Sequence, residues 1–287
     1  MSSPFASIPL FEPWLHYKHP MVRQLAFAIA SPGILTAIPP ELEIKHAFEL
    51  HSSDIWHQHY ERYQPRLAAL DQQPEELIQF VQQLKSTRLG LRFEMFIWFW
   101  LQDSSYHPYT LLGHSIQMID GPRTAGELDF VLLNRNTQEI EHWEAALKYY
   151  LAERNLSLPY WYGLNRSDTL NRKLSHFTQK QFQFKHVLNV DIQKRYCVLK
   201  GQLYLPEMNT KPLPYWVNQQ RRIGLWGQRI PKKAQALYRL ERHEWICPNL
   251  EPSSEPAQWW TDGLYKQQFT QDYYMYRQPC LLQTAEF

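Results

Sequence analysis

Cysteine is scarce in this sequence of 287 residues, which contains only Cys197, Cys247 and Cys280. An odd number of widely separated cysteines matches neither a disulfide framework nor a zinc-ligand pattern. Such usage is typical of proteins kept in a reducing compartment. We therefore expect a cytoplasmic location.

Long apolar runs and a targeting signal are also missing. The longest apolar run, Phe96–Leu101, is far shorter than the roughly 20 residues that a membrane-spanning helix needs. The first residues lack the basic-then-apolar layout of a signal peptide. We expect no membrane partner.

Net charge and glycine content are both low. A formal net charge of +2 argues against a strongly basic coat for nucleic acid, but it permits a local basic patch. Ten glycines against 20 prolines indicate ordered connections rather than flexible linkers. With 44% hydrophobic and 15% aromatic residues, the chain can build a sizeable core and is not disordered in composition.

Residues 126–150 contain two short runs, with acidic side chains in both, joined by a polar turn. The first, Glu127–Leu133, has the apolar content of a strand. Because side chains alternate along a strand, Glu127 and Asp129 share one face. If the second run, Ile140–Tyr150, returns as the antiparallel partner after an even-length loop, Glu144 and Lys148 lie on that same side.

The second run has an alternative. The letters EAALK form a very good helix sequence, in which Glu144 and Lys148 make an i,i+4 ion pair. Acidic residues on a strand are also commonly just a solvated face. From the residues alone, helix is slightly favoured for Glu141–Tyr150, and both alternatives stay open.

As a hairpin, this stretch has a chemical meaning. Two or three carboxylates on neighbouring strands form an oxygen-ligand site for Mg²⁺ or Mn²⁺. A metal held there can polarise a phosphoryl oxygen and lower the pKa of a bound water. A nearby lysine can stabilise the developing charge. These groups suit phosphodiester hydrolysis.

The order G-E-L-D-F, a turn and then W-E-x-x-x-K resembles the core of the PD-(D/E)XK nuclease-like superfamily. The wider chain, from Val22 to Pro206, resembles an uncharacterised bacterial family, a domain of unknown function, placed in that superfamily. The similar pieces are VRQLAFAIASPGIL, TRLGLRFE, GELDF, HWEAALKYYL and KGQLYLP. The resemblance favours a strand for Glu141–Tyr150. It implies that Asp129 and Glu144 hold the metal.

One position departs from the superfamily pattern. Ala146 stands two residues before Lys148, where the acid of the acid-x-Lys motif is expected. Glu144 can be a migrated ligand, and Glu127 can supply a third oxygen. By the resemblance, Lys148 stabilises charge or positions water. The departure leaves open a decayed site that binds without cleaving.

Glu94 lies in a strongly apolar predicted helix, where a buried carboxylate needs a partner. That partner can be Arg88 or Arg92. The resemblance implies instead that Glu94 supports the metal site from the helix that precedes the core strands.

A helix after Ser167-Asp168 carries Lys173, Phe177 and Gln181 at four-residue steps. The resemblance places this helix beside the site, so Lys173 and Gln181 become candidate phosphate contacts. The alternative is an ordinary amphipathic helix with a solvated lysine.

After Pro206, cations alternate with aromatic residues, a pattern that suits a phosphate backbone and stacked bases. The alternative is a packed aromatic subdomain with a solvated basic face. We also expect a short helix over Ala234–Leu240. The candidate nucleic-acid contacts are Arg221, Arg222, Arg229, Lys232 and Lys233.

Together these patterns predict an α/β fold: a PD-(D/E)XK nuclease-like core with a small mixed sheet flanked by helices. The expected regions are an N-terminal helical part (1–86), the core (87–206) and a basic, aromatic-rich C-terminal part packed on the core (207–287). The predicted function is Mg²⁺- or Mn²⁺-dependent cleavage of DNA or RNA. The alternatives are a decayed nuclease fold that binds nucleic acid or protein, and a helical interaction protein.

Overall fold

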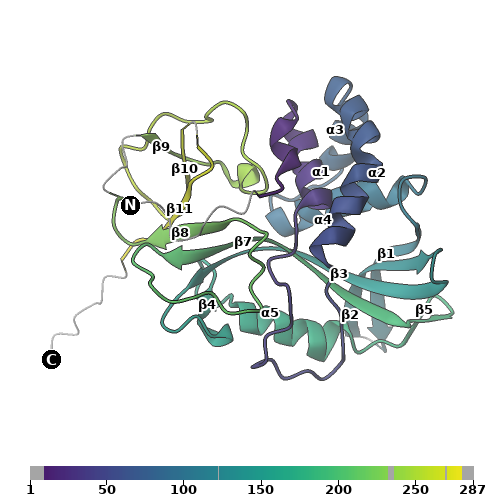
Figure 1. Cartoon of the computed structure of the whole chain (residues 1–287). Coiled ribbons are helices and arrows are strands. Elements are labelled where there is room, and N and C mark those ends of the chain that lie inside the picture. Colours follow the sequence, from purple (N-terminus) through teal and green to yellow (C-terminus); the bar gives the residue numbers. More distant parts are fainter. Residues whose placement is uncertain (1–9, 122, 232–235, 269, 280–287) are drawn as a thin grey trace.

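A computed structural model describes residues 10–121, 123–231, 236–268 and 270–279. One mixed sheet of nine strands runs through the molecule, with helices on both faces (Figure 1). This confirms the α/β class, but the sheet is larger than the small one expected. The helices are α1 (Pro20–Ala30), α2 (Ser53–Gln72), α3 (Glu75–Gln82), α4 (Leu89–Gln102) and α5 (Leu170–His176), with the 3-10 turns η1 (Pro13–His16), η2 (Leu158–Tyr160) and η5 (Arg242–Trp245) and the π-helix η3 (Phe177–Gln181).

The strand order is β1-β2-β3-β7-β8-β11-β10-β9, and β4 pairs with the end of β3. The pairs β3–β7, β7–β8 and β8–β11 are parallel, whereas the others in this sheet are antiparallel. A separate hairpin joins β5 to β6. The strands are β1 (Tyr109–Asp120), β2 (Arg123–Asn134), β3 (Glu139–Ala152), β4 (Trp161–Tyr162), β5 (His186–Val187), β6 (Val190–Asp191), β7 (Lys194–Pro206), β8 (Ile223–Gly227), β9 (Leu237–Arg239), β10 (Gly263–Gln267) and β11 (Tyr273–Tyr276).

The helix-forming sequence EAALK lies in strand β3, so the strand prediction is confirmed and the helical alternative is wrong. Successive side chains of β3 point to opposite faces of the sheet, and both faces are buried. Trp143 and Leu147 enter the core under α1, α2 and α4, while Ala146 and Tyr150 enter the core that contains α5. Burial on both faces overrides the local helix preference, as is usual for central strands.

Helices α1–α4 cover one face of the sheet, and α5 lies on the other (Figure 1). Helix α4 is apolar on nearly all sides because it packs between the other helices and the sheet, where Phe93, Phe96 and Trp100 are buried. Helix α2, which the sequence patterns did not predict, adds Trp56 and Tyr63 to this core. No helix in the described ranges combines the length and apolar character of a membrane span.

The C-terminal part continues the sheet. Strand β8 pairs with Leu203–Pro206 of β7, so the sheet crosses the expected boundary after residue 206. The predicted helix over Ala234–Leu240 is wrong for Leu237–Arg239, which form β9 because they pair with β10. Residues 234 and 235 lie outside the described ranges.

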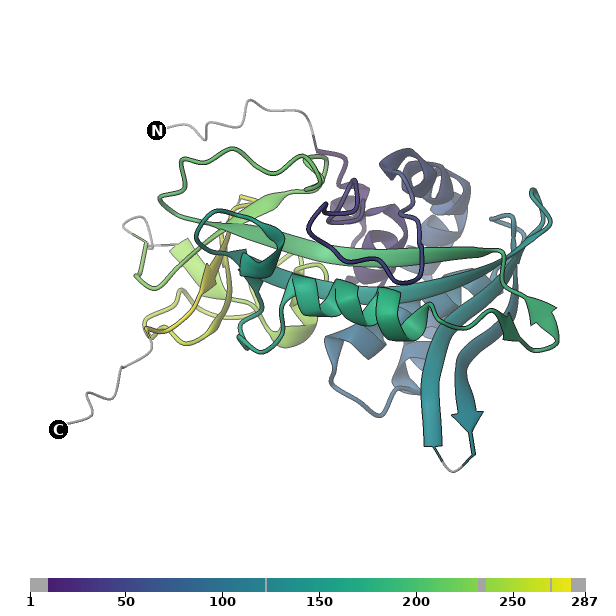
Figure 2. The same ribbon diagram turned by 90° about the horizontal axis from the view of Figure 1, so that it is seen from below.

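Strands β2 and β3 pair over only part of their length, from Phe130–Asn134 against Glu139–Trp143. Beyond that point β2 follows β1, whereas β3 continues beside β7. The far ends of β1 and β2 therefore project away from the rest of the sheet (Figure 2). The opening between the strands begins at Asp129 and Glu144, the next residues along each strand.

Candidate functional site

A cleft of about 710 Å³ lies where β2 and β3 separate. The first turn of α4, strand β3, helix α5 and turn η5 all contribute to its walls. Acidic and basic side chains are equally represented among its charged residues. They are Arg88, Glu94, Asp129, Glu144, Lys148, Asp168, Lys173 and Arg242.

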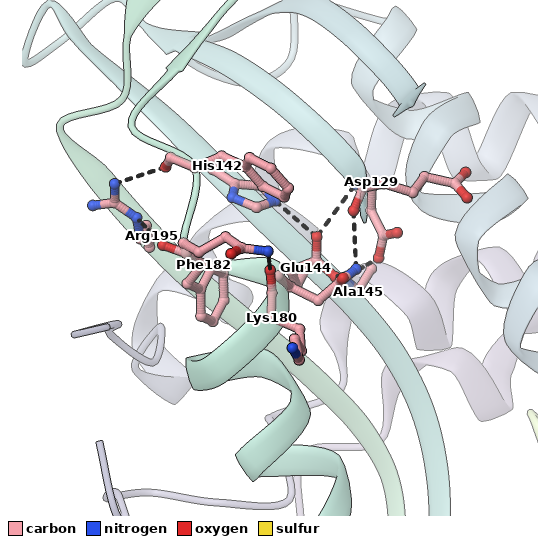
Figure 3. A network of polar contacts seen from close by, with 11 residues as sticks. Asp129, His142, Glu144, Ala145, Lys180, Phe182 and Arg195 are labelled. Carbon is pink, nitrogen blue, oxygen red and sulfur yellow. Dashed lines mark hydrogen bonds and ion pairs between the residues drawn. The ribbon is translucent and has the colours of Figure 1, made fainter. Parts of the chain in front are cut away.

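Asp129 and Glu144 form an acidic pair across the opening. The backbone N–H of Ala145 donates to Asp129 Oδ2 at 2.8 Å, and the backbone N–H of Asp129 lies 3.4 Å from Glu144 Oε1. Each carboxylate is thus tied to the backbone of the other strand (Figure 3). Within the described ranges Asp129 Oδ1 accepts no hydrogen bond, so this oxygen is free for a ligand.

Two further side chains fix Glu144. His142 Nε2 lies 2.7 Å from Oε1, and the Gln181 amide donates to Oε2 at 2.9 Å. Gln181 also donates to the carbonyl of Glu127 at 2.9 Å, so it links the acidic pair to β2. In the structure Gln181 therefore holds Glu144 in place, and the phosphate contact suggested by the sequence stays a prediction.

The π-helix η3 explains why Gln181 reaches this carboxylate together with Lys173. In an α-helix, positions eight residues apart are about 80° out of line, because each turn takes 3.6 residues. A π-helical turn holds more residues, so it rotates later positions back and reduces this offset. Lys173 and Gln181 consequently both line the cleft.

The acidic pair is costly to ionise without a cation. Burial raises the pKa of Glu144 to about 7. Burial also raises the pKa of Asp129 well above its ordinary value, and the charge of Glu144 adds to this effect. Burial lowers the pKa of His142 to about 3, so its contact with Glu144 is a hydrogen bond of a neutral imidazole.

The two lysines near the pair differ in their partners. Lys148 Nζ forms an ion pair with Asp168 at 2.6 Å. Lys173 Nζ lies 4.0 Å from the centre of the Phe177 ring and makes no hydrogen bond or ion pair within the described chain. Burial lowers the pKa of Lys173, while the charges of Glu144 and Asp129 oppose that shift. Lys173 is therefore the lysine coupled to both carboxylates.

The two accessory acids are placed differently from each other. Glu94 lines the cleft, and its partner is His114, 2.8 Å away, rather than Arg88 or Arg92. Glu127 is exposed, accepts a hydrogen bond from Ser115 and is not part of the cleft lining. Glu94 thus remains close enough to assist the pair, whereas Glu127 contributes through its backbone carbonyl.

Among the described residues, the three arginines expected to contact nucleic acid, Arg221, Arg222 and Arg229, differ in their surroundings. Arg221 is buried, where it donates to the carbonyl of Gly201 at 2.9 Å. Arg222 forms an ion pair with Glu12 at 2.6 Å. Glu12 also forms an ion pair with Arg221. Both arginines therefore hold the N-terminal part onto the sheet. Arg229 is exposed, and Lys232 and Lys233 lie outside the described residues.

Sequence patterns missed two charged residues of the cleft. Arg242 in η5 stacks on Trp245 at 3.9 Å, and no motif marks it. The sequence marked Ser167-Asp168 only as the start of a helix, whereas in the structure Thr169 is the N-cap of α5 and Asp168 binds Lys148 and Tyr150.

The donor set suits a hard divalent cation with few protein ligands. In the portions of the chain that the structure describes, no three His, Cys, Asp or Glu side chains are grouped as a metal site. However, Mg²⁺ commonly binds through one or two carboxylates, keeps several waters and takes substrate phosphates as further ligands. Asp129, with its free oxygen, and Glu144 fit that mode.

The fold and the cleft define a class of protein: a mixed α/β protein with a pair of carboxylates, one buried and one half-buried, where two strands of its central sheet separate. The chain belongs to a family described as a domain of unknown function, DUF1853, whose model matches residues 23–287. This confirms the predicted family of unknown function. The match includes the C-terminal part that supplies Arg242. No curated protein matches the chain, and no solved structure matches it.

Proposed function

We propose that this protein is a divalent-metal-dependent phosphodiesterase that acts on nucleic acid with a PD-(D/E)XK-like site. The observation that carries the proposal is the acidic pair, Asp129 and Glu144, at the opening between β2 and β3 with Lys173 facing it. Two neighbouring carboxylates with raised pKa values are an arrangement that a divalent cation would stabilise.

Asp129 and Glu144 would hold Mg²⁺ or Mn²⁺, which when bound supplies a Lewis acid and a more acidic water. The chain itself contributes preorganisation. His142 and Gln181 fix both oxygens of Glu144, so the carboxylate need not reorient when substrate arrives. This support resembles the outer-shell hydrogen bonds that orient ligands in metal sites.

Lys173 is the cation that we assign to the developing phosphoryl charge. Its amine has no competing ion pair, and its lowered pKa follows from burial beside the pair. On β3, Ala146 is two residues beyond Glu144 and adds no carboxylate to the pair, and Lys173 approaches the pair from α5. Lys148 is held in an ion pair by Asp168, and we assign it a structural role in the wall of the cleft.

The test is cleavage of single- and double-stranded DNA and RNA in Mn²⁺. We expect Asp129→Asn and Lys173→Met each to lower the rate about 100- to 1,000-fold, since removing one preorganised charge-stabilising group costs roughly 10²–10³. Lys148→Met should lower the rate less than about tenfold on the same scale. Lys211→Met, an exposed lysine that does not line the cleft, is the matched control.

Each outcome has a distinct meaning. Equal rates in all variants would place the activity elsewhere and refute the site. A large loss with Lys148→Met but not with Lys173→Met would overturn the choice of lysine. No cleavage by any protein, with Mn²⁺ binding absent, would favour the alternative of a nucleic-acid-binding module without catalysis.

A further inference from the structure

We propose that Arg172, His176 and Lys180 form a track for the phosphate backbone of nucleic acid along the outer side of α5 and η3. The proposal extends the function above, since the track begins at the mouth of the cleft. It concerns binding, whereas the acidic pair concerns cleavage. None of these three residues was singled out by the sequence patterns.

Helix geometry places the three basic residues together. Arg172, His176 and Lys180 follow one another at four-residue steps, which keeps them on one side of a helix. Lys173 and Gln181, one position further along, face the acidic pair instead. All three track residues are exposed, so the helix presents one charged side to the cleft and another to solvent.

A shallow hollow of about 460 Å³ runs beside the track. It shares Asp168 and Lys173 with the cleft, so the two depressions meet at the start of α5. A strand lying in the hollow would therefore be led to the acidic pair. The hollow is lined by Ser167, Asp168, Arg172, Lys173, Ser175, His176, Gln179 and Lys180.

The track carries charge without local compensation. In the described ranges, none of its three side chains forms an ion pair with a carboxylate. Asp168, the acid in the hollow, is already bound by Lys148 at 2.6 Å and by Tyr150 at 3.2 Å. Arg172 donates one N–H to the carbonyl of Ser167, which fixes the guanidinium and leaves its other donors free.

The spacing suits a polyanion rather than a single phosphate. At 1.5 Å per residue, eight residues of helix cover about 12 Å. Phosphates follow one another at about 3.4 Å per strand along a duplex axis, so this length spans about three to four of them. Arginine and lysine on such a row release counterions from the backbone, which makes binding dependent on salt.

The experiment measures binding of labelled single-stranded and duplex DNA by fluorescence anisotropy, in EDTA, over a range of salt concentrations. The track variant is Arg172→Gln with His176→Gln and Lys180→Gln. The control variant is His16→Gln with Lys18→Gln and Arg62→Gln, which removes the same residue types from exposed positions in the layer of α1 and α2.

For duplex DNA we expect the track variant to lower the slope of log K against log salt by about 1.8, since each phosphate contact contributes about 0.9 and His176 is largely neutral at pH 7.5. Affinity should fall at least about tenfold at 100 mM salt on the same basis. The control should stay within about twofold of wild type. Unchanged melting temperatures would show that both variants are folded.

An unchanged slope in the track variant would overturn the proposal, as would an equal loss in both variants. Loss of binding to anionic vesicles alone would assign the cations to a membrane surface and overturn it too. Because EDTA removes metal chemistry, the two proposals fail separately. If the track variant alone loses binding and wild type cleaves nothing, the track is supported and the cleavage site is not. If wild type cleaves and the track variant binds DNA as wild type does, the cleavage site is supported and the track is not.

Discussion

Replacing Glu144 by Gln should remove a pH dependence of stability that this carboxylate imposes. Glu144 is 1% exposed, and its pKa rises from an ordinary 4.5 to about 7 because burial disfavours the charged form. The folded state therefore binds a proton between pH 4.5 and 7 that the unfolded state has lost. With a raised carboxyl pKa, the free energy of unfolding falls as the pH rises through this window.

The magnitude follows from the difference between the two pKa values. Each pH unit of difference corresponds to about 1.4 kcal/mol, so ionised Glu144 costs the metal-free protein about 3 kcal/mol. Between pH 5 and pH 8 wild type should lose about 2 to 3 kcal/mol relative to Glu144→Gln by this linkage. In the variant, Asp129 no longer lies beside a second negative charge, so its pKa is raised less. This also makes the stability of the variant less dependent on pH than that of wild type.

The substitution can keep two of the three hydrogen bonds of position 144 and loses only the long one, 3.4 Å, from the backbone N–H of Asp129. A glutamine at position 144 can accept from Gln181 and donate to His142 Nε2. Neutral histidine can then carry its proton on Nδ1, which is buried without a partner in the wild-type structure. The variant is therefore expected to fold. His51 and His107, whose pKa values burial also lowers, are common to both proteins and cancel in the comparison.

The assay is urea denaturation of both proteins at pH 5, 6, 7 and 8, first in EDTA and then in Mn²⁺. Parallel stability profiles in EDTA would refute the reasoning about burial. At 100 times its dissociation constant, Mn²⁺ should stabilise wild type by about 3 kcal/mol at pH 8 and less at pH 5, because ligands must be deprotonated. Equal stabilisation of the variant would refute Glu144 as a ligand.

Two further predictions concern stability alone. Gly201 has φ +128° and a Cβ there would overlap the carbonyl oxygen of Lys148, so Gly201→Ala should lower the free energy of unfolding by at least about 3 kcal/mol, measured in urea. Gly90→Ala, where a Cβ meets nothing within 4 Å, should be neutral or stabilising by up to about 1 kcal/mol, and an equal loss in both would contradict the strain argument. Lys200 is buried against the Trp56 ring at 3.4 Å and its pKa lies well below the ordinary value, so wild type should gain stability relative to Lys200→Met as the pH rises from 7 to 10. A constant difference in urea denaturation over that range would show that Lys200 is not perturbed.

The sequence alone determined the class of fold and the identity of the acidic pair. Strand periodicity places Asp129 and Glu144 on one side of a hairpin when the two runs are antiparallel neighbours joined by an even-length loop. The apolar pattern of α4 likewise marked a buried helix. These inferences succeeded because alternation and amphipathicity are local properties, and a few residues suffice to define them.

The sequence did not by itself decide whether the residues of β3 form a helix or a strand. Its letters favour a helix, and the decision came from burial on both faces beside β7, a partner some 50 residues away. The number of strands could not be predicted for the same reason. Short strands such as β9 and β11 become strands only because a neighbouring edge is present to accept their hydrogen bonds.

Only the tertiary structure decided which charged groups meet. It brought Lys173 rather than Lys148 to the acidic pair, through the separation of β2 from β3 and the π-helical turn before Gln181. It buried Arg221 in the core and placed Arg242 at the cleft. Charges carry no periodic signal that names their partners, because a salt bridge depends on positions that distant segments reach only when the chain is folded.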